Sequence, residues 1–291
     1  MPSCPPATGR RATCRPGLRL VLAAAAVGAA TLTASAPATA SPALAPVSHP
    51  GSDRMGSTVA AHEGRAPARA AGPAGSEAVA GTATRLRGLD VSHWQGDVDW
   101  AAVWAKGGRF AYMKATESTT YTDPYFKQNY NGSYAAGLIR GAYHFALPDR
   151  ASGTAQADFF VDHGGGWSPD GRTLPPVLDI EYNPYGGTCY GMGRRAMVSW
   201  IRAFSDQVQA RIGRTPAIYT TTDWWNQCTG SNTGFGSTHP LFLARYADAV
   251  GPLPAGWRSY AFWQYADSGK LPGDQDLYNG QLPRLETFAR G

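Results

Sequence analysis

The feature that most constrains the fold is an alternation of strand-like and helix-like stretches that begins near residue 86. Short apolar runs predict strands at 87–92, 110–116, 139–146, 177–182 and 217–221. Longer amphipathic stretches between them predict helices at 100–106, 125–136, 154–163 and 194–212. The clearest helical face carries Met197, Ile201, Phe204, Val208 and Ile212. Strands that alternate with helices form βαβ units, so this part of the chain predicts a parallel sheet.

After residue 221 the alternation stops. Strands are predicted at 241–245, 261–265 and 275–278, with no convincing helix between them. The total is about eight strands over residues 86–291. A closed α/β barrel with five regular βα units and a helix-poor final third fits both the count and the length. An open, flavodoxin-like sheet is the alternative.

The net charge of +5 does not belong to this predicted barrel. Residues 1–85 carry eight Arg against Asp53, Glu63 and Glu77, which accounts for the whole excess, so the remainder is formally neutral. Every Trp, Tyr and Phe also lies beyond residue 85. A nucleic-acid-binding protein needs a basic surface, and the barrel sequence does not predict one. We therefore expect no nucleic-acid partner.

The first 40 residues have the pattern of an export signal. A basic region with Arg10, Arg11, Arg15 and Arg19 precedes an apolar, Ala-rich stretch at 18–32 and small-residue cleavage sites at 34–36 and 38–40. The Arg pair at 10–11 leaves a twin-arginine signal open. We expect a secreted protein with no membrane contact once the signal is removed. Residues 41–85, rich in Ala, Pro, Gly and Ser, predict a disordered linker or pro-segment.

The cysteines agree with export. Cys4 and Cys14 would leave with the signal, so Cys189 and Cys228 remain as one pair in a secreted domain and predict a disulfide. Two unpaired thiols are the alternative. The histidines of the barrel sequence are isolated from one another, and no Cys or His spacing typical of a metal site occurs. We expect neither a metal nor a cofactor.

Four carboxylates lie in or at the ends of predicted strands. Asp90 occurs in "GLDVSHWQG", Asp179 and Glu181 in "VLDIEYN", and Asp276 in "GDQDLYN". Strand side chains alternate, so Asp179 and Glu181 point the same way. In a barrel the last strand neighbours the first, which brings Asp276 back to Asp90. A single acid at a strand end is commonly a helix cap or an ion-pair partner. Four that converge repel one another, so at least one should keep its proton, as glycosidic cleavage requires.

Six stretches then match one family in order: "GLDVSHWQGDVDW", "AYMKATES", "GAYHFA", "VLDIEYN", "FLARY" and "FWQYADSGKLPGDQDLY". Together they resemble glycoside hydrolase family 25, the Chalaropsis-type lysozymes, and the Ala-rich leader is similar to that of secreted Streptomyces enzymes. The resemblance covers 86–291. It implies a single catalytic domain, an irregular TIM-like (β/α)₅(β)₃ barrel, that cleaves the β-1,4 bond between N-acetylmuramic acid and N-acetylglucosamine in peptidoglycan.

The resemblance also implies roles for the acids. Glu181 matches the family's general acid. Asp179, roughly 6.5–7 Å away at Cα along an extended strand, would orient the substrate's 2-acetamido group in a substrate-assisted mechanism. Asp90 and Asp276 would be supporting acids. Direct inversion, with Asp90 or Asp276 activating a water, stays open.

Further residues are candidates for binding the sugar. Tyr143, Tyr182, Tyr219 and Trp263 could form the stacking surface, and Lys114, Gln264 and Arg245 could supply hydrogen bonds. Packing in the core is the alternative for each aromatic residue, and an ion pair within the barrel is the alternative for Lys114.

Two other functions make different predictions about the sequence. A chitinase-like hydrolase predicts a longer Asp-x-x-Asp-x-Asp-x-Glu run, of which "LPPVLDIEYN" has only the end. A barrel that binds peptidoglycan without cutting it predicts the loss of Asp179 or Glu181, and both are present. The sequence therefore favours a secreted muramidase that acts on bacterial cell-wall peptidoglycan, and we expect a monomer.

Overall fold

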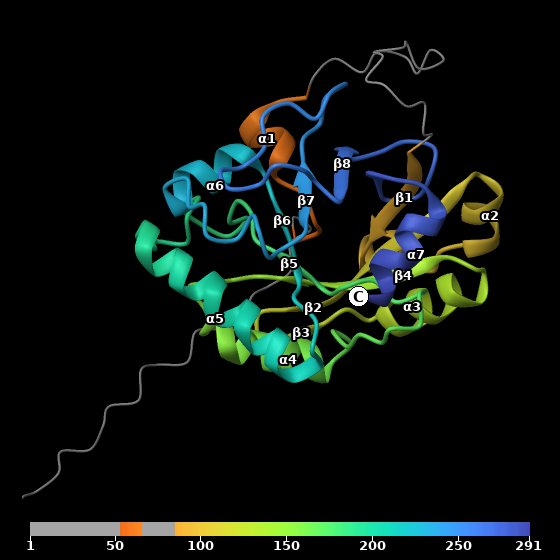
Figure 1. Cartoon of the computed structure of the whole chain (residues 1–291), viewed down its shortest axis with the longest axis horizontal. Coiled ribbons are helices and arrows are strands. Elements are labelled where there is room, and N and C mark those ends of the chain that lie inside the picture. The colour runs from red at the N-terminus through yellow and green to blue at the C-terminus, as the bar shows by residue number, and fades with distance from the viewer. Residues whose placement is uncertain (1–52, 66–84) are drawn as a thin grey trace, which may run out of the picture. The chain divides into compact units, whose positions relative to one another are not determined.

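The computed structural model describes residues 53–65 and 85–291 of the chain (Figure 1). The predicted signal peptide at 1–40 lies outside the described residues, as do 41–52 and 66–84 of the predicted linker. Within the described residues, no helix has both the length and the apolar character needed to cross a membrane.

Eight strands close into one barrel. They are β1 (Leu86–Val91), β2 (Gly108–Glu117), β4 (Ile139–Phe145), β5 (Val177–Asp179), β6 (Ala217–Thr220), β7 (Leu241–Ala244), β8 (Phe262–Ala266) and β9 (Asp274–Tyr278). Each pairs with the next in that order, and β9 pairs back with β1. The short β3 (Tyr121–Thr122) extends the sheet from the end of β2. The closed barrel confirms the predicted fold class and excludes the open-sheet alternative.

The last strand runs against its neighbours. All adjacent barrel strands are parallel except the two pairs that include β9. Only residues 267–273 join β8 to β9, whereas a parallel connection needs a dozen or more residues, so the link forms a hairpin. As a result Asp274, the first residue of β9, pairs with Asp90, while Asp276 pairs with Gly88.

Helices cover the outside of the barrel. They are α2 (Trp100–Ala105), α3 (Phe126–Ala135), α4 (Gly153–Asp162), α5 (Arg194–Ile212), α6 (Thr222–Thr229) and α7 (Leu282–Arg290), with a 3₁₀ turn at His93–Gln95. The bounds of α5 coincide with the predicted helix, and α4 lies beside it (Figure 1). The sequence analysis did not predict α6 or α7. α6 begins directly after β6, where the Thr221 hydroxyl accepts a hydrogen bond from the Trp224 amide at 3.0 Å and caps the helix.

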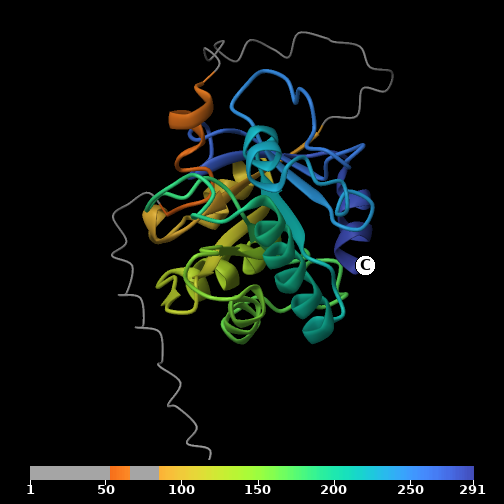
Figure 2. The same ribbon diagram turned by 90° about the vertical axis from the view of Figure 1, so that its left-hand side faces the viewer.

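Two apolar layers hold the barrel together. Inside it, aromatic side chains pack on one another in tilted and edge-to-face pairs: Phe110, Tyr112, Tyr219, Phe242 and Phe262. Gly141 makes room for them, because a Cβ there would lie 2.7 Å from Cδ1 of Tyr112. The second layer lies between the strands and the helices of the green-to-teal region in Figure 2, and it joins Leu178 and Ile180 to Ile201 and Phe204. Alternating side chains of each strand thus face the two layers.

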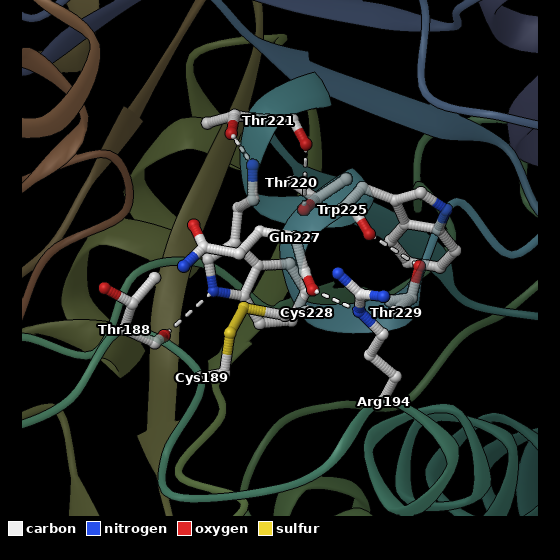
Figure 3. Close-up of a disulfide and its surroundings, with 10 residues drawn as sticks. Thr188, Cys189, Arg194, Thr220, Thr221, Trp225, Gln227, Cys228 and Thr229 are labelled. Atoms are coloured by element: carbon white, nitrogen blue, oxygen red, sulfur yellow. Dashed lines mark hydrogen bonds between the residues drawn. A yellow bond between two sulfur atoms is a disulfide. The ribbon is translucent and has the colours of Figure 1, made fainter.

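The predicted disulfide is confirmed. Cys189, in the loop after β5, is bonded to Cys228 in α6, with their Cα atoms 5.4 Å apart (Figure 3). Beside it the Trp224 indole donates to the Thr188 carbonyl at 3.1 Å, and the Arg194 guanidinium donates to the Gln227 carbonyl at 3.1 Å. The bond therefore ties the glycine-rich loop after the acid-bearing strand to the helix after the next strand.

The prediction that all of 41–85 lacks structure is wrong for residues 53–65. This stretch contains the short helix α1 (Val59–Glu63), and Asp53, Met55 and Val59 have no exposed surface. Its apolar residues are too few to predict a fold from composition. They are buried because they meet the barrel, and that tertiary contact leaves no periodic pattern in the sequence.

Candidate active site

Four carboxylates meet at the end of the barrel where the parallel strands finish. Asp90 lies near the end of β1, Asp179 is the last residue of β5, Glu181 follows two residues later, and Asp274 begins β9. Each is at most 2% exposed. Catalytic side chains of α/β barrels lie at this end, and the structure brings Asp90, Asp179 and Glu181 together as the sequence predicted.

Asp276 lies deeper than predicted. Because β9 is antiparallel, Asp276 pairs with Gly88 rather than with the end of β1. Its side chain is fully buried, and no described residue donates a hydrogen bond to either carboxylate oxygen. The acid that faces Asp90 at the mouth is Asp274, which the sequence analysis missed. The short β8–β9 connection was the available signal for it.

The side chain of Gln264 links two of the acids by hydrogen bonds. Its side-chain amide donates to Oδ2 of Asp90 at 2.7 Å and to Oδ2 of Asp274 at 3.3 Å. Its carbonyl oxygen accepts from the hydroxyls of Tyr219 at 2.7 Å and Tyr246 at 3.0 Å. These four contacts fix which way the amide points. Gln264 and Tyr219 were predicted site residues. Tyr246 was not, although it ends the quoted "FLARY" stretch.

Burial keeps protons on these acids. Desolvation raises the pKa of Glu181 to about 8 and that of Asp90 to about 7. Desolvation also raises the pKa of Asp179, and the neighbouring Glu181 charge adds to the rise. The pKa of Asp274 is raised by burial and then by Asp90. At neutral pH the group therefore holds several protons, and Glu181 has a transferable one.

A buried cation completes the polar cluster. The Lys114 ammonium, with no exposed surface, lies 2.6 Å from Oε2 of Glu117 and 3.0 Å from Oδ2 of Asp53. The Tyr185 hydroxyl donates to the other oxygen of Glu117 at 2.8 Å. Two predicted site residues, Lys114 and Tyr143, both reach the mouth. Glu117 and Tyr185 had not been predicted.

Two predicted sugar contacts, Trp263 and Arg245, lie away from the acids, and a third, Tyr182, lies at the rim. Trp263 neighbours Gln264 on β8, so the two face opposite layers, and the Trp263 indole donates to the Arg245 carbonyl at 2.9 Å within the outer apolar layer. The side chain of Arg245 lies against Gly251. Tyr182 likewise packs in the outer layer, and its hydroxyl reaches the rim to donate to Oε1 of Glu63 at 2.8 Å. Strand alternation turns Trp263 away from the acids, and the sugar contacts of Trp263 and Arg245 stay predictions.

Comparison with known proteins gives a consistent picture. Residues 89–274 match the family model described as glycosyl hydrolases family 25. Lysozyme M1 of Streptomyces globisporus is 48% identical over 209 residues, which are 70% of this chain and 71% of the relative. The N,O-diacetylmuramidase of Chalaropsis sp is 45% identical over 210 residues, which are 71% of this chain and 100% of the relative.

Solved structures agree. A muramidase from Acremonium alcalophilum superposes with a TM-score of 0.70 and 52% identity, covering 71% of this chain and 100% of that one. A bacterial lysozyme from Streptomyces coelicolor does so with a TM-score of 0.69 and 47% identity, covering 71% of this chain and 98% of that one. Residues 85–291 make up the same 71% share of this chain. In length, the whole Chalaropsis and Acremonium chains therefore correspond to the barrel alone.

Proposed function

The chain belongs to glycosyl hydrolase family 25, and from this membership we propose that it is a secreted muramidase. Its reaction would be hydrolysis of the β-1,4 bond between N-acetylmuramic acid and N-acetylglucosamine in bacterial peptidoglycan. The observation that carries the proposal is the position of Glu181, a buried carboxyl at the barrel mouth beside Asp179 and Asp90, where burial raises its pKa to about 8. The relatives named lysozyme and N,O-diacetylmuramidase support the choice of substrate.

Glu181 would be the general acid. Its proton passes to the oxygen of the leaving sugar as the bond from that oxygen to the anomeric carbon breaks. The carbonyl oxygen of the substrate's own acetamido group forms the new bond to the anomeric carbon, which gives an oxazolinium ion. Asp179, once ionised, would hold the acetamido nitrogen and offset the positive charge. Water then opens the ring and gives its proton to the Glu181 carboxylate, which restores the acid.

Asp90, Asp274 and Asp276 would support this pair. Asp90 and Asp274 share the Gln264 amide, so they fix its direction and that of the two tyrosines bonded to it. Tyr143, Tyr219, Gln264 and Lys114 would contact the sugar from the barrel mouth. Direct inversion would give the product anomer opposite to the one that the substrate-assisted route gives. NMR of freshly cleaved glycan distinguishes the two anomers.

Export is part of the proposal. The basic and apolar pattern of residues 1–40 is that of a signal peptide, and disulfides persist in oxidising compartments. The Cys189–Cys228 bond is consistent with such a location.

The test is a digestion of purified peptidoglycan by a chain that begins at Arg85, followed by borohydride reduction and mass spectrometry. A muramidase leaves N-acetylmuramic acid at the new reducing end, whereas an N-acetylglucosaminidase leaves N-acetylglucosamine. Chitin serves as the control substrate and should stay intact. Reducing-end N-acetylglucosamine, or no new ends at all, would contradict the proposal.

A further inference from the structure

Residues 53–63, here called the plug, occupy the mouth of the barrel. The backbone amide of Gly56 donates to Oε1 of Glu181 at 2.6 Å. The Gly56 carbonyl accepts from the Tyr246 hydroxyl at 2.9 Å, and the Met55 amide donates to the Tyr143 hydroxyl at 3.4 Å. One turn of peptide thus bonds to the proposed acid and to two tyrosines beside it.

The first plug residue also takes up the buried lysine. Asp53 places its carboxylate 3.0 Å from the Lys114 ammonium, and its backbone carbonyl accepts from the same group. The Trp94 indole donates to the other carboxylate oxygen at 3.4 Å. A plug carboxylate therefore stands where a polar group of a sugar would meet Lys114.

The end of the plug covers an aromatic side chain at the rim. The His62 ring stacks on Tyr182, with centroids 4.0 Å apart and planes 4° from parallel. Glu63 accepts the Tyr182 hydroxyl at 2.8 Å. A flat ring with hydrogen-bonding edges lies against this tyrosine, much as a sugar ring would.

These contacts close the site to a polymer. Asp53, Met55 and Val59 have no exposed surface, and Glu181 and Asp179 are each 1% exposed. A glycan strand has to place its glycosidic oxygen within hydrogen-bond reach of the Glu181 proton. In this arrangement peptide atoms already fill that space.

A purely structural role for the plug fits less well. The whole Acremonium and Chalaropsis chains correspond in length to residues 85–291, so a barrel of this family forms without such a segment. Lys114 also keeps Glu117 as a partner if Asp53 leaves. The plug can therefore undock without leaving this buried cation unpaired.

We propose that residues 53–63 are an intramolecular inhibitor that binds the substrate groove in place of the glycan, so that the intact chain cuts peptidoglycan only when the plug has left. This proposal rests on the proposed muramidase function where its test measures activity, but not where its test measures peptide binding.

Two glycines offer a matched pair of substitutions in the full chain. Gly56 and Gly64 have almost the same backbone angle, φ +76° and +77°. A Cβ on Gly56 would lie 2.7 Å from the Tyr219 hydroxyl and still closer to Gln264 and Tyr246, whereas a Cβ on Gly64 meets nothing within 4 Å. Both substitutions place alanine at the same positive φ, but only Gly56→Ala collides with the site.

We expect Gly56→Ala to raise turbidity clearing by the full chain at least about tenfold, because activity follows the fraction of open molecules. Gly64→Ala should stay near the unsubstituted chain. A protease site placed within 66–84, once cut, should bring the rate to that of a chain beginning at Arg85. Equal clearing by the intact, cut and Gly56→Ala chains would overturn the inhibitor while leaving the muramidase proposal standing.

Binding gives the second readout. A synthetic peptide of residues 53–63 should bind the chain that begins at Arg85 in calorimetry, and the same peptide with Gly56→Ala should bind at least about tenfold more weakly. This holds whether or not the barrel cuts peptidoglycan. Failure of every chain to cut, with peptide binding intact, would reject the muramidase and keep the plug. Absence of peptide binding together with unchanged clearing by Gly56→Ala would reject the plug.

Discussion

Glu181 is the residue on which the proposed chemistry depends most directly. Glu181→Gln keeps the shape and a hydrogen-bonding group but removes the transferable proton. General acid catalysis contributes roughly 10²–10⁴-fold, so we expect at least a hundredfold loss of clearing by the chain that begins at Arg85. Circular dichroism should show an unchanged fold. Glu286→Gln in α7 is the control for removing one carboxylate, and near-normal clearing by Glu181→Gln would reject the role of Glu181.

The buried acids also predict how stability depends on pH. The folded-state pKa values of Asp90, about 7, and Glu181, about 8, lie above those of exposed carboxyls. Between about pH 4 and pH 8 the folded chain therefore holds protons that the unfolded chain has released. The contribution of these two acids to stability is greatest below that window and is lost as pH rises through it. Asp90→Asn removes one such group, so the fall in melting temperature from pH 5 to pH 8 should be smaller. An unchanged or steeper fall would contradict the assignment.

At the scale of residues, the sequence predicted which acids belong to the site better than how deep in the barrel each acid lies. Asp179 and Glu181 were placed correctly because one intervening residue fixes their common side. Asp274 and Asp276 share a side for the same reason, so alternation could not tell which one lies at the mouth. Only the direction of the strand decides that. Trp263 lies in the outer apolar layer because it neighbours Gln264 and the two side chains face opposite layers.

At the scale of the elements, a disulfide joins the loop after β5 to helix α6, and its contribution to stability can be tested. The Cys189–Cys228 bond spans a sequence separation of 39, for which the chain-entropy model gives roughly 3–4 kcal/mol. Replacing both cysteines by serine should lower the melting temperature by about 10 °C, because 1 kcal/mol corresponds to about 2–4 °C in a domain of this size. Clearing should weaken without disappearing, since neither cysteine bears the proposed chemistry. An unchanged melting temperature would show that packing alone holds the loop.

Elements with a strong period were predictable, and those set by their neighbours were not. Helix α5 was predicted with its full bounds because one face is apolar along its length. Helix α6 is short and rich in Trp, Thr and Asn, which are weak helix formers, and its cap and disulfide stabilise it instead. The antiparallel β9 could have been predicted from the length of its connection.

For the whole molecule, the closed barrel followed from strand count and chain length, but the plug did not. Residues 53–63 have the composition of a linker, with Met55 and Val59 as their largest apolar side chains. Part of what orders them is a set of backbone hydrogen bonds to Glu181, Tyr143 and Tyr246, which add to the side-chain contacts of the segment. Contacts made by the backbone leave no signature in composition or periodicity.

The plug limits the access of water to the barrel acids, and a last prediction follows from this. Burial is the first cause of the raised pKa values of Asp90 and Glu181, and the Gly56 amide lies directly on Glu181. A chain that begins at Arg85 admits water to these carboxyls, so we expect both pKa values to fall, because burial outweighs the Gly56 and Arg54 contacts that are lost with the plug. The neighbouring Asp90 still holds the pKa of Glu181 above that of an exposed carboxyl. Folded and unfolded forms then bind more similar numbers of protons, and the fall in melting temperature from pH 5 to pH 8 becomes shallower. The full chain with Gly56→Ala should follow the shortened chain, and Gly64→Ala should follow the intact one. If all four chains show the same slope, the barrel walls and not the plug keep water from the acids.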